Sequence, residues 1–217
     1  MKKSLILALL GLGMLASCSK SGGEDTDPVL SYMSLTAGQI RTFEVKDSLT
    51  GVLNTVIQTS SNADTIVGSR SYHVFNESDG NKQYFNISGN DYYTLFNIPG
   101  VSSTTPLELL YLKANATVGT SWSQNFSFTL PGVPLPVPVT FTHTLKETGL
   151  TKTTGAITHQ NVIRVETKVS STLASITSDI QTYSAPNYGV VHITTYIAEP
   201  ISGVEVNSRR TMTGANF

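Results

Sequence analysis

The chain has 217 residues, a length that suits one domain with a sizeable core or two small ones. Its 14 basic and 15 acidic side chains give a formal net charge of −1 without a basic patch, which argues against nucleic acid as a partner. The single cysteine excludes an internal disulfide. Charged residues make up only 13% of the chain, and its many Thr, Ser, Val and Tyr residues favour strands and turns.

The first 17 residues have the pattern of a secretory signal peptide. Lys2 and Lys3 provide a cationic start, and an apolar run follows over residues 4–15. This run is too short to span a bilayer, because a spanning helix needs about 20 residues. We therefore predict that residues 1–17 are a signal that is removed from the mature protein.

The segment Leu15-Ala16-Ser17-Cys18 at the end of this signal resembles the lipobox of bacterial lipoproteins. In that family the cysteine thiol is diacylated, the signal is cleaved in front of it, and the new amino terminus is usually acylated. The resemblance implies that Cys18 is the lipidation site. Two or three acyl chains hold a protein stably on a membrane, whereas one chain binds only marginally, so the membrane is the expected partner of this end.

Residues 18–28 form a predicted flexible tether, because the segment after Cys18 has no apolar residue and is rich in Gly, Ser and acids. Ser19 is not the aspartate that resembles an inner-membrane retention signal, which favours the outer membrane. The acidic residues after the cysteine resemble surface-export signals of Bacteroidetes-type lipoproteins, but Lys20 interrupts that pattern. Both a periplasmic and a surface-facing orientation stay open.

Residues 29–217 are predicted to form a single all-β domain, because the body shows period-2 alternation rather than helical spacing. The clearest case is residues 121–130, in which Trp122, Phe126 and Phe128 share one parity and small polar residues hold the other. The pattern predicts an antiparallel meander of about 11 to 13 strands, forming a curled open sheet, a half-barrel or a sandwich. The predicted strands cover residues 39–46, 53–59, 66–67 continued by 70–75, 82–87, 92–96, 107–113, 121–130, 139–146, 162–169, 176–183, 190–197 and 204–212.

Four other segments have specific predictions. Residues 30–35 are either a short first strand or an apolar lead-in, residues 60–64 are a loop, and the Thr-rich residues 149–155 are a turn. Residues 131–138 carry alternate prolines, which no central strand tolerates. We interpret them as a hairpin tip or protected edge, with a polyproline ligand for a partner as the alternative.

Two short motifs resemble those of a recurring group of uncharacterised bacterial lipoproteins. They are Val118-Gly119-Thr120-Ser121-Trp122, which fits a Val-Gly-x-x-Trp turn, and residues 185–191, which read Ala-Pro-Asn-Tyr-Gly-Val-Val. The resemblance implies an antiparallel meander curled into an open barrel. It supplies no catalytic residues that could be assigned here.

No catalytic, cofactor or metal motif emerges from the sequence. The histidines are not spaced as metal ligands, and the oxygen-rich residues 76–81 are explained by a hairpin turn as well as by calcium. A Ser-His-Asp triad stays possible, since such triads are assembled in space rather than along the chain. The carboxylates supply candidates for glycoside hydrolysis, but nothing selects a pair. We therefore expect no catalytic residues, metal or cofactor.

The aromatic residues are the remaining candidates for ligand contact. Tyr92 and Tyr93 are adjacent in a predicted strand, so they should face opposite ways, and one should be exposed or line a second layer. Both are candidate ligand-binding residues. Trp122, by contrast, is expected to pack in the core.

These observations lead to a non-enzymatic, lipid-anchored β domain of the cell envelope that binds or scaffolds an unknown ligand or protein. The alternative is a carrier of an apolar ligand, and a third hypothesis is a hydrolase acting on polysaccharide. The concave face of the sheet should discriminate between them. An open apolar trough would support the carrier, exposed aromatics over a filled core would support a binding module, and two carboxylates in a cleft would support the hydrolase.

Overall fold

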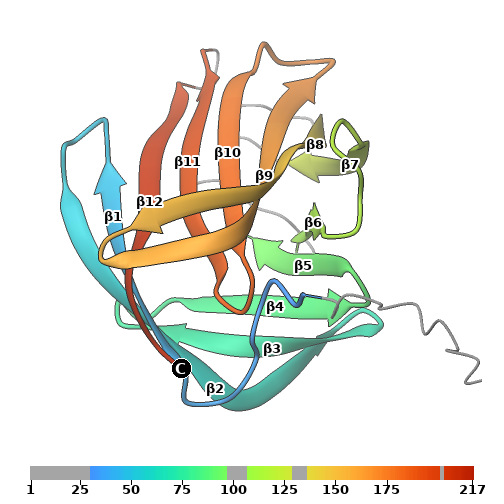
Figure 1. The fold of residues 1–217 in the computed structure, drawn as a ribbon. Helices are drawn as coiled ribbons and strands as arrows, with labels where there is room; N and C mark the ends of the chain where they lie inside the picture. Colours follow the sequence, from blue (N-terminus) through green and yellow to red (C-terminus); the bar gives the residue numbers. More distant parts are fainter. Residues whose placement is uncertain (1–29, 97–106, 129–135, 201–202) are drawn as a thin grey trace, which may run out of the picture.

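The computed structural model describes residues 30–96, 107–128, 136–200 and 203–217. The predicted signal, Cys18 and the tether lie outside the described residues, as do residues 131–135 of the proline-rich segment. The described residues form twelve strands and no helix (Figure 1). The strands are β1 (Ile40–Asp47), β2 (Leu53–Val67), β3 (Arg70–Glu77), β4 (Lys82–Ser88), β5 (Asp91–Phe96), β6 (Leu107–Lys113), β7 (Ser121–Phe128), β8 (Val137–Thr154), β9 (Ile157–Ser171), β10 (Thr177–Ala185), β11 (Gly189–Glu199) and β12 (Val204–Asn216).

All twelve strands belong to one antiparallel sheet in the order β6-β5-β4-β3-β2-β1-β12-β11-β10-β9-β8-β7. Strands that are neighbours in sequence pair with each other, except for β6 and β7, which are the two edges of the sheet. In addition, β1 pairs with β12, with Ile40 opposite Asn216. The sheet curls until it is nearly closed (Figure 1). The predicted all-β meander and its strand number are thus confirmed. Of the predicted alternatives, the structure shows a curled sheet and not a sandwich.

Side chains bridge the seam where β6 and β7 meet. No backbone ladder joins these two edge strands in the described part of the chain. Instead, Gln124 on β7 accepts a hydrogen bond from the Leu110 N–H (2.7 Å) and donates one to the Glu108 carbonyl (3.2 Å). The Trp122 indole N–H donates to the Leu110 carbonyl at 2.8 Å. Two β7 side chains therefore satisfy backbone groups that an adjacent strand would normally satisfy.

The predictions for residues 60–64 and 149–155 are wrong. Strand β2 runs through the first segment, and an irregularity between Ser60 and Asp64 takes up the extra residues. Strand β8 likewise runs to Thr154, with three register shifts between Leu145 and Lys152. Bulges allow these polar segments to stay paired within a strand. The alternation of the sequence does not distinguish such a bulged strand from a loop.

The long β8–β9 hairpin crosses over β10, β11 and β12 (Figure 1). Its turn at Gly155 has φ +56°, and a Cβ there would lie 2.8 Å from the Thr213 Cα, so glycine permits both the turn and the contact. The ammonium of Lys152 lies 3.9 Å from the centre of the Tyr183 ring. The hairpin thereby gives these strands a second packing layer.

Residues 30–35 form an apolar lead-in rather than a strand. The lead-in joins the turn between β10 and β11, where the Asn187 N–H donates to the Ser31 carbonyl at 2.7 Å. Gly189, which follows this turn as the first residue of β11, has φ +76°, and a Cβ there would meet the Met33 sulfur. The positive φ therefore favours glycine at this position of the Ala-Pro-x-x-Gly-Val-Val motif, next to the Met33 side chain. No helix able to cross a membrane occurs among the residues described.

Candidate ligand-binding cavity

A cavity of about 400 Å³ lies inside the curled sheet. Every strand except β3 and β7 contributes to its lining. Its surface is mainly apolar, and the contributing side chains include Phe85, Phe96, Leu109, Phe141, Ile180, Ile193 and Ile197. No carboxylate is among the described lining residues, so the pair that glycoside hydrolysis needs is not present on this surface.

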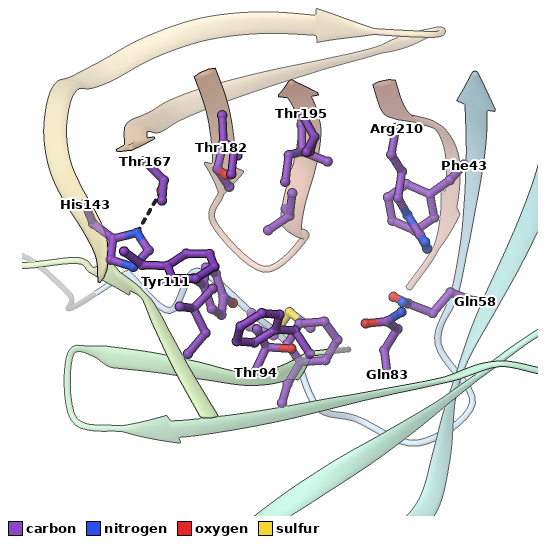
Figure 2. Close-up of a pocket in the computed structure, with 18 of the residues that line it drawn as sticks. Phe43, Gln58, Gln83, Thr94, Tyr111, His143, Thr167, Thr182, Thr195 and Arg210 are labelled. Atoms are coloured by element: carbon purple, nitrogen blue, oxygen red, sulfur yellow. Dashed lines mark hydrogen bonds between the residues drawn. The ribbon is translucent and has the colours of Figure 1, made fainter. Parts of the chain in front are cut away.

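Polar side chains gather on one side of the cavity, as the positions of Gln58, Gln83 and Arg210 show in Figure 2. They converge on the buried carboxylate of Glu77. Arg210 pairs with it at 2.5 Å, and the amides of Gln58 and Gln83 donate to it at 3.3 and 3.4 Å. The Arg210 guanidinium also lies 4.1 Å from the centre of the Phe43 ring. This group of polar residues, together with Arg41, is called the cationic pole below.

Arg41 is the most unusual residue of the cationic pole, since its exposed fraction is 1%. Its guanidinium donates to the Ser34 carbonyl at 2.8 Å and to the Gln58 side-chain oxygen at 3.4 Å, while its Nε has no hydrogen-bond partner among the described residues. The faces of Phe75 and Phe217 lie 4.8 and 5.8 Å from the guanidinium carbon. Burial lowers the pKa of Arg41 to about 10.

His143 lies on the opposite side of the cavity, next to Thr167 (Figure 2). Its exposed fraction is 1%, and its Nδ1 is 2.7 Å from the Thr167 hydroxyl. The ring stacks on Trp122 with 5.4 Å between centroids, and its Nε2 has no partner in the described part of the chain. Burial lowers the pKa of His143 to about 4, so the ring is neutral at pH 7.

The structure buries both candidate tyrosines and places neither among the cavity-lining residues. The Tyr92 hydroxyl accepts a hydrogen bond from the Tyr32 N–H at 2.8 Å, inside the core. Tyr93 is covered by the Arg70 guanidinium, 3.7 Å from its ring centre, and Arg70 in turn pairs with Glu108. Both tyrosines therefore make contacts within the protein and do not face the cavity.

The structure brings together a serine, a histidine and an aspartate, as the sequence left possible. The Ser60 hydroxyl is 2.9 Å from His73 Nε2, and His73 Nδ1 is 2.8 Å from the Asp64 carboxylate. However, Ser60 is only 2% exposed, and its N–H donates to the Gln39 carbonyl. A nucleophile needs space for a reacting carbonyl and free donors beside it, whereas this serine is buried and its own N–H is already bonded. The contacts instead bind the irregular part of β2 to β3.

The remaining candidates have simpler surroundings. Residues 76–81 run from the end of β3 through the β3–β4 turn, in which Asp79 accepts hydrogen bonds from Asn81. Within the described ranges, no group of three or more His, Cys, Asp or Glu side chains could hold a metal ion. Trp122 is half-buried and packs against the core, beside the seam.

Sequence reasoning missed Arg41 as a site residue, although a signal was present. Arg41 shares its strand parity with Phe43 and Val45, so the alternation that predicted this strand also placed a charge on its apolar face. A charged residue on a buried face requires a partner or a function. Nothing comparable indicated His143, whose parity is compatible with ordinary core packing.

No protein-family model and no curated protein matches the chain. Among solved structures, a predicted lipoprotein from Parabacteroides distasonis ATCC 8503 is similar, with 13% identity and a TM-score of 0.52, over 86% of this chain and 99% of that one. A predicted exported protein with a YmcC-like fold from Bacteroides fragilis NCTC 9343 is 12% identical with a TM-score of 0.45, over 87% of this chain and 100% of that one. The first likeness concerns the fold alone.

Proposed function

We propose that this chain is a lipid-anchored, non-catalytic binding protein of the cell envelope that holds the apolar part of a small ligand inside its curled sheet. The observation that carries the proposal is the apolar cavity of about 400 Å³. Its volume lies within the range of roughly 300–1,000 Å³ that is usual for small-molecule sites. A scaffold would not need such a cavity, so ligand holding is favoured over a purely structural role.

Binding of an uncharged, apolar fluorescent probe such as N-phenyl-1-naphthylamine tests this function. The full chain carrying Cys18→Ser should be used, because it lacks the acylation site and needs no detergent that could compete for the cavity. We expect saturable binding of one probe per chain, with the emission of a probe that is removed from water.

Two adjacent threonines on β11 provide a matched pair of variants. Thr195 lines the cavity, as Figure 2 shows, whereas Thr194 is not among the lining residues. Thr195→Phe should fill part of the cavity and weaken probe binding about tenfold or more, while Thr194→Phe should leave it unchanged. Equal affinities in both variants, or no saturable binding in the parent chain, would contradict the proposal.

The membrane anchor is tested separately. The lipobox-like segment ending at Cys18 supports acylation of its thiol. Cys18→Ser should abolish incorporation of labelled palmitate and move the protein from the membrane to the soluble fraction of the cells. Incorporation at the parental level would show that Cys18 is not the acylation site.

A further inference from the structure

The cationic pole carries an excess of positive charge. Arg41 and Arg210 supply two cations, and among the described residues Glu77 is the single carboxylate that contacts them or their amide neighbours. Glu77 is already paired with Arg210 at 2.5 Å. Arg41 makes no ion pair with any carboxylate of the described residues, so its charge is uncompensated.

Arg41 is also short of hydrogen-bond acceptors. A guanidinium has five N–H donors, and within the described ranges the 2.8 Å contact with the Ser34 carbonyl is the one short bond that Arg41 makes. The contacts with the Gln58 oxygen and the Met33 sulfur are long, at 3.4 and 3.6 Å, and Nε is unpartnered. A charge that is nearly fully buried costs free energy unless it is paired and hydrogen-bonded. The ring of Phe75 offsets only part of this cost, because cation–π contacts are weaker than charge-assisted hydrogen bonds.

An oxyanion would satisfy both deficits at once. Carboxylate and phosphate oxygens match the planar donor fork of arginine, and they would balance the excess charge. Because Arg41 and Gln58 both line the cavity, an anion inside the cavity would be able to contact them. Gln83 and the second guanidinium, of Arg210, line the same side and would add donors around it.

The rest of the cavity is suited to a hydrocarbon chain. Much of the remaining wall is apolar and includes Phe96, Phe141, Ile180 and Ile197, which belong to one hydrophobic cluster. The volume of about 400 Å³ is near the lower end of the usual range for ligand sites, which favours one chain over two. A charged group at one side and apolar walls beyond it are complementary to an amphiphile.

We propose that the ligand is a single-chain amphiphile with an anionic head, either a carboxylate or a phosphate monoester, and that this head pairs with Arg41. This inference rests on the proposed function, since it specifies the ligand of the same cavity.

A series of ligands with one chain length tests the head group on the full chain carrying Cys18→Ser. Dodecanoate, monododecyl phosphate, dodecanol and dodecylammonium should each displace the uncharged probe below their micelle concentrations. We expect at least one of the two anions to bind about tenfold or more tighter than the alcohol, and the ammonium to bind more weakly than the alcohol. Acetate and inorganic phosphate, which lack a chain, should not displace the probe at millimolar concentrations.

The outcomes separate the two proposals. If dodecanol binds as tightly as both anions, or dodecylammonium binds tightest, the anionic head is wrong although the apolar cavity stands. If neither the uncharged probe nor any chain binds, the proposed function itself fails. If inorganic phosphate or acetate displaces the probe as well as the long chains do, the site is for a small anion rather than an amphiphile.

A pair of variants then tests whether the anionic head group of the ligand pairs with Arg41. Arg41→Gln should abolish the preference for anions over dodecanol while binding of the uncharged probe persists, which also shows that the variant is folded. Arg209→Gln is the matched control, because Arg209 pairs with Glu44 at 3.2 Å on the exposed surface. A preference that survives in Arg41→Gln would overturn the assignment to Arg41. If Arg41→Gln does not fold, the ligand series on the parent chain still decides the charge of the head.

Discussion

At the scale of single residues, His143 makes the stability of the protein dependent on pH. Burial lowers its pKa from 6.5 to about 4 in the folded state. Between these values the unfolded chain binds a proton that the folded chain does not. The contribution of neutral His143 to the free energy of unfolding is therefore complete above pH 6.5 and is lost as the pH falls towards 4. For His143 alone, the free energy of unfolding should fall by about 3 kcal/mol over this window.

Urea unfolding at a series of pH values measures this effect. Burial, together with the charges of Lys152 and Arg209, also lowers the pKa of His192 to about 4, so the dependence on pH should not vanish in a single variant. His143→Gln should reduce the loss of stability between pH 6.5 and 4 relative to the parent chain. An unchanged slope would indicate that His143 is protonated in the folded state or accessible to water.

A second residue-scale prediction concerns Ser60, His73 and Asp64. If these residues hold the irregular part of β2 on β3, Ser60→Ala should lower the free energy of unfolding by about 1–3 kcal/mol, because His73 Nε2 would lose its partner. Ser61→Ala is the control, since among the described residues the hydroxyl of Ser61 forms hydrogen bonds only with the backbone of Ala63 in the same segment. Covalent labelling of Ser60 by a fluorophosphonate would instead show an accessible nucleophile and restore the hydrolase hypothesis.

These residues show what strand parity can and cannot reveal. Parity placed Arg41 on the apolar face of its strand, but it could not show that no carboxylate would meet it there. The grouping of Ser60 with His73 depends on the register of β2 on β3, and an irregularity between Ser60 and Asp64 alters that register. Such contacts belong to the three-dimensional pairing and have no signature along the chain.

At the scale of secondary-structure elements, the seam between β6 and β7 depends on side chains. Gln124 satisfies the Leu110 N–H and the Glu108 carbonyl. Gln124→Ala should therefore leave these backbone groups without protein partners and lower the free energy of unfolding by about 1 kcal/mol. The exchange of the Leu110 amide hydrogen should also become about tenfold faster, because the edge strand opens more readily.

Hydrogen exchange followed by NMR measures this opening at the level of single amides. Ser127→Ala on the same strand is a suitable control, because its side chain is exposed on the other parity. Exchange at Leu110 that stays as slow as in the control would mean that Gln124 does not hold the seam.

The elements themselves were largely predictable, and the failures have one cause. Alternation predicted most strands closely, including the β4–β5 hairpin with its short turn. It failed at residues 60–64 and 149–155 because a bulge adds residues that break the alternation while the strand continues. The period-two alternation ends at each bulge. The two parts of one strand on either side of the bulge are therefore interpreted as two strands separated by a loop.

At the scale of the whole molecule, the cavity was an open alternative that the sequence could not decide. The same alternation is compatible with a filled core, since it specifies which side chains point inwards but not how completely they fill the interior. The volume left over depends on how far the sheet curls and on which residues from distant strands face one another. For this protein β1 pairs with β12, from the two ends of the described body, and the edge strands β6 and β7 meet where the curl comes round.

The position of the cavity predicts that a ligand stabilises the whole body as one unit. Strands from both ends of the sheet order line the cavity, including β5 and β6 at one end and β8 and β9 towards the other. A ligand that binds only the folded state, at 100 times its dissociation constant, should raise the free energy of unfolding by about 2.7 kcal/mol. For a body of this length the corresponding rise in Tm is roughly 5–10 °C.

Calorimetry of the Cys18→Ser chain with and without dodecanoate measures this shift. We expect one cooperative transition that moves as a whole, because loss of either end of the sheet would remove part of the cavity wall. Thr195→Phe should melt as one transition but lose most of the shift, whereas Thr194→Phe should retain it. Two separate transitions, of which the ligand moves only one, would show that the binding site belongs to one part of the sheet and that the curled sheet does not unfold as a unit.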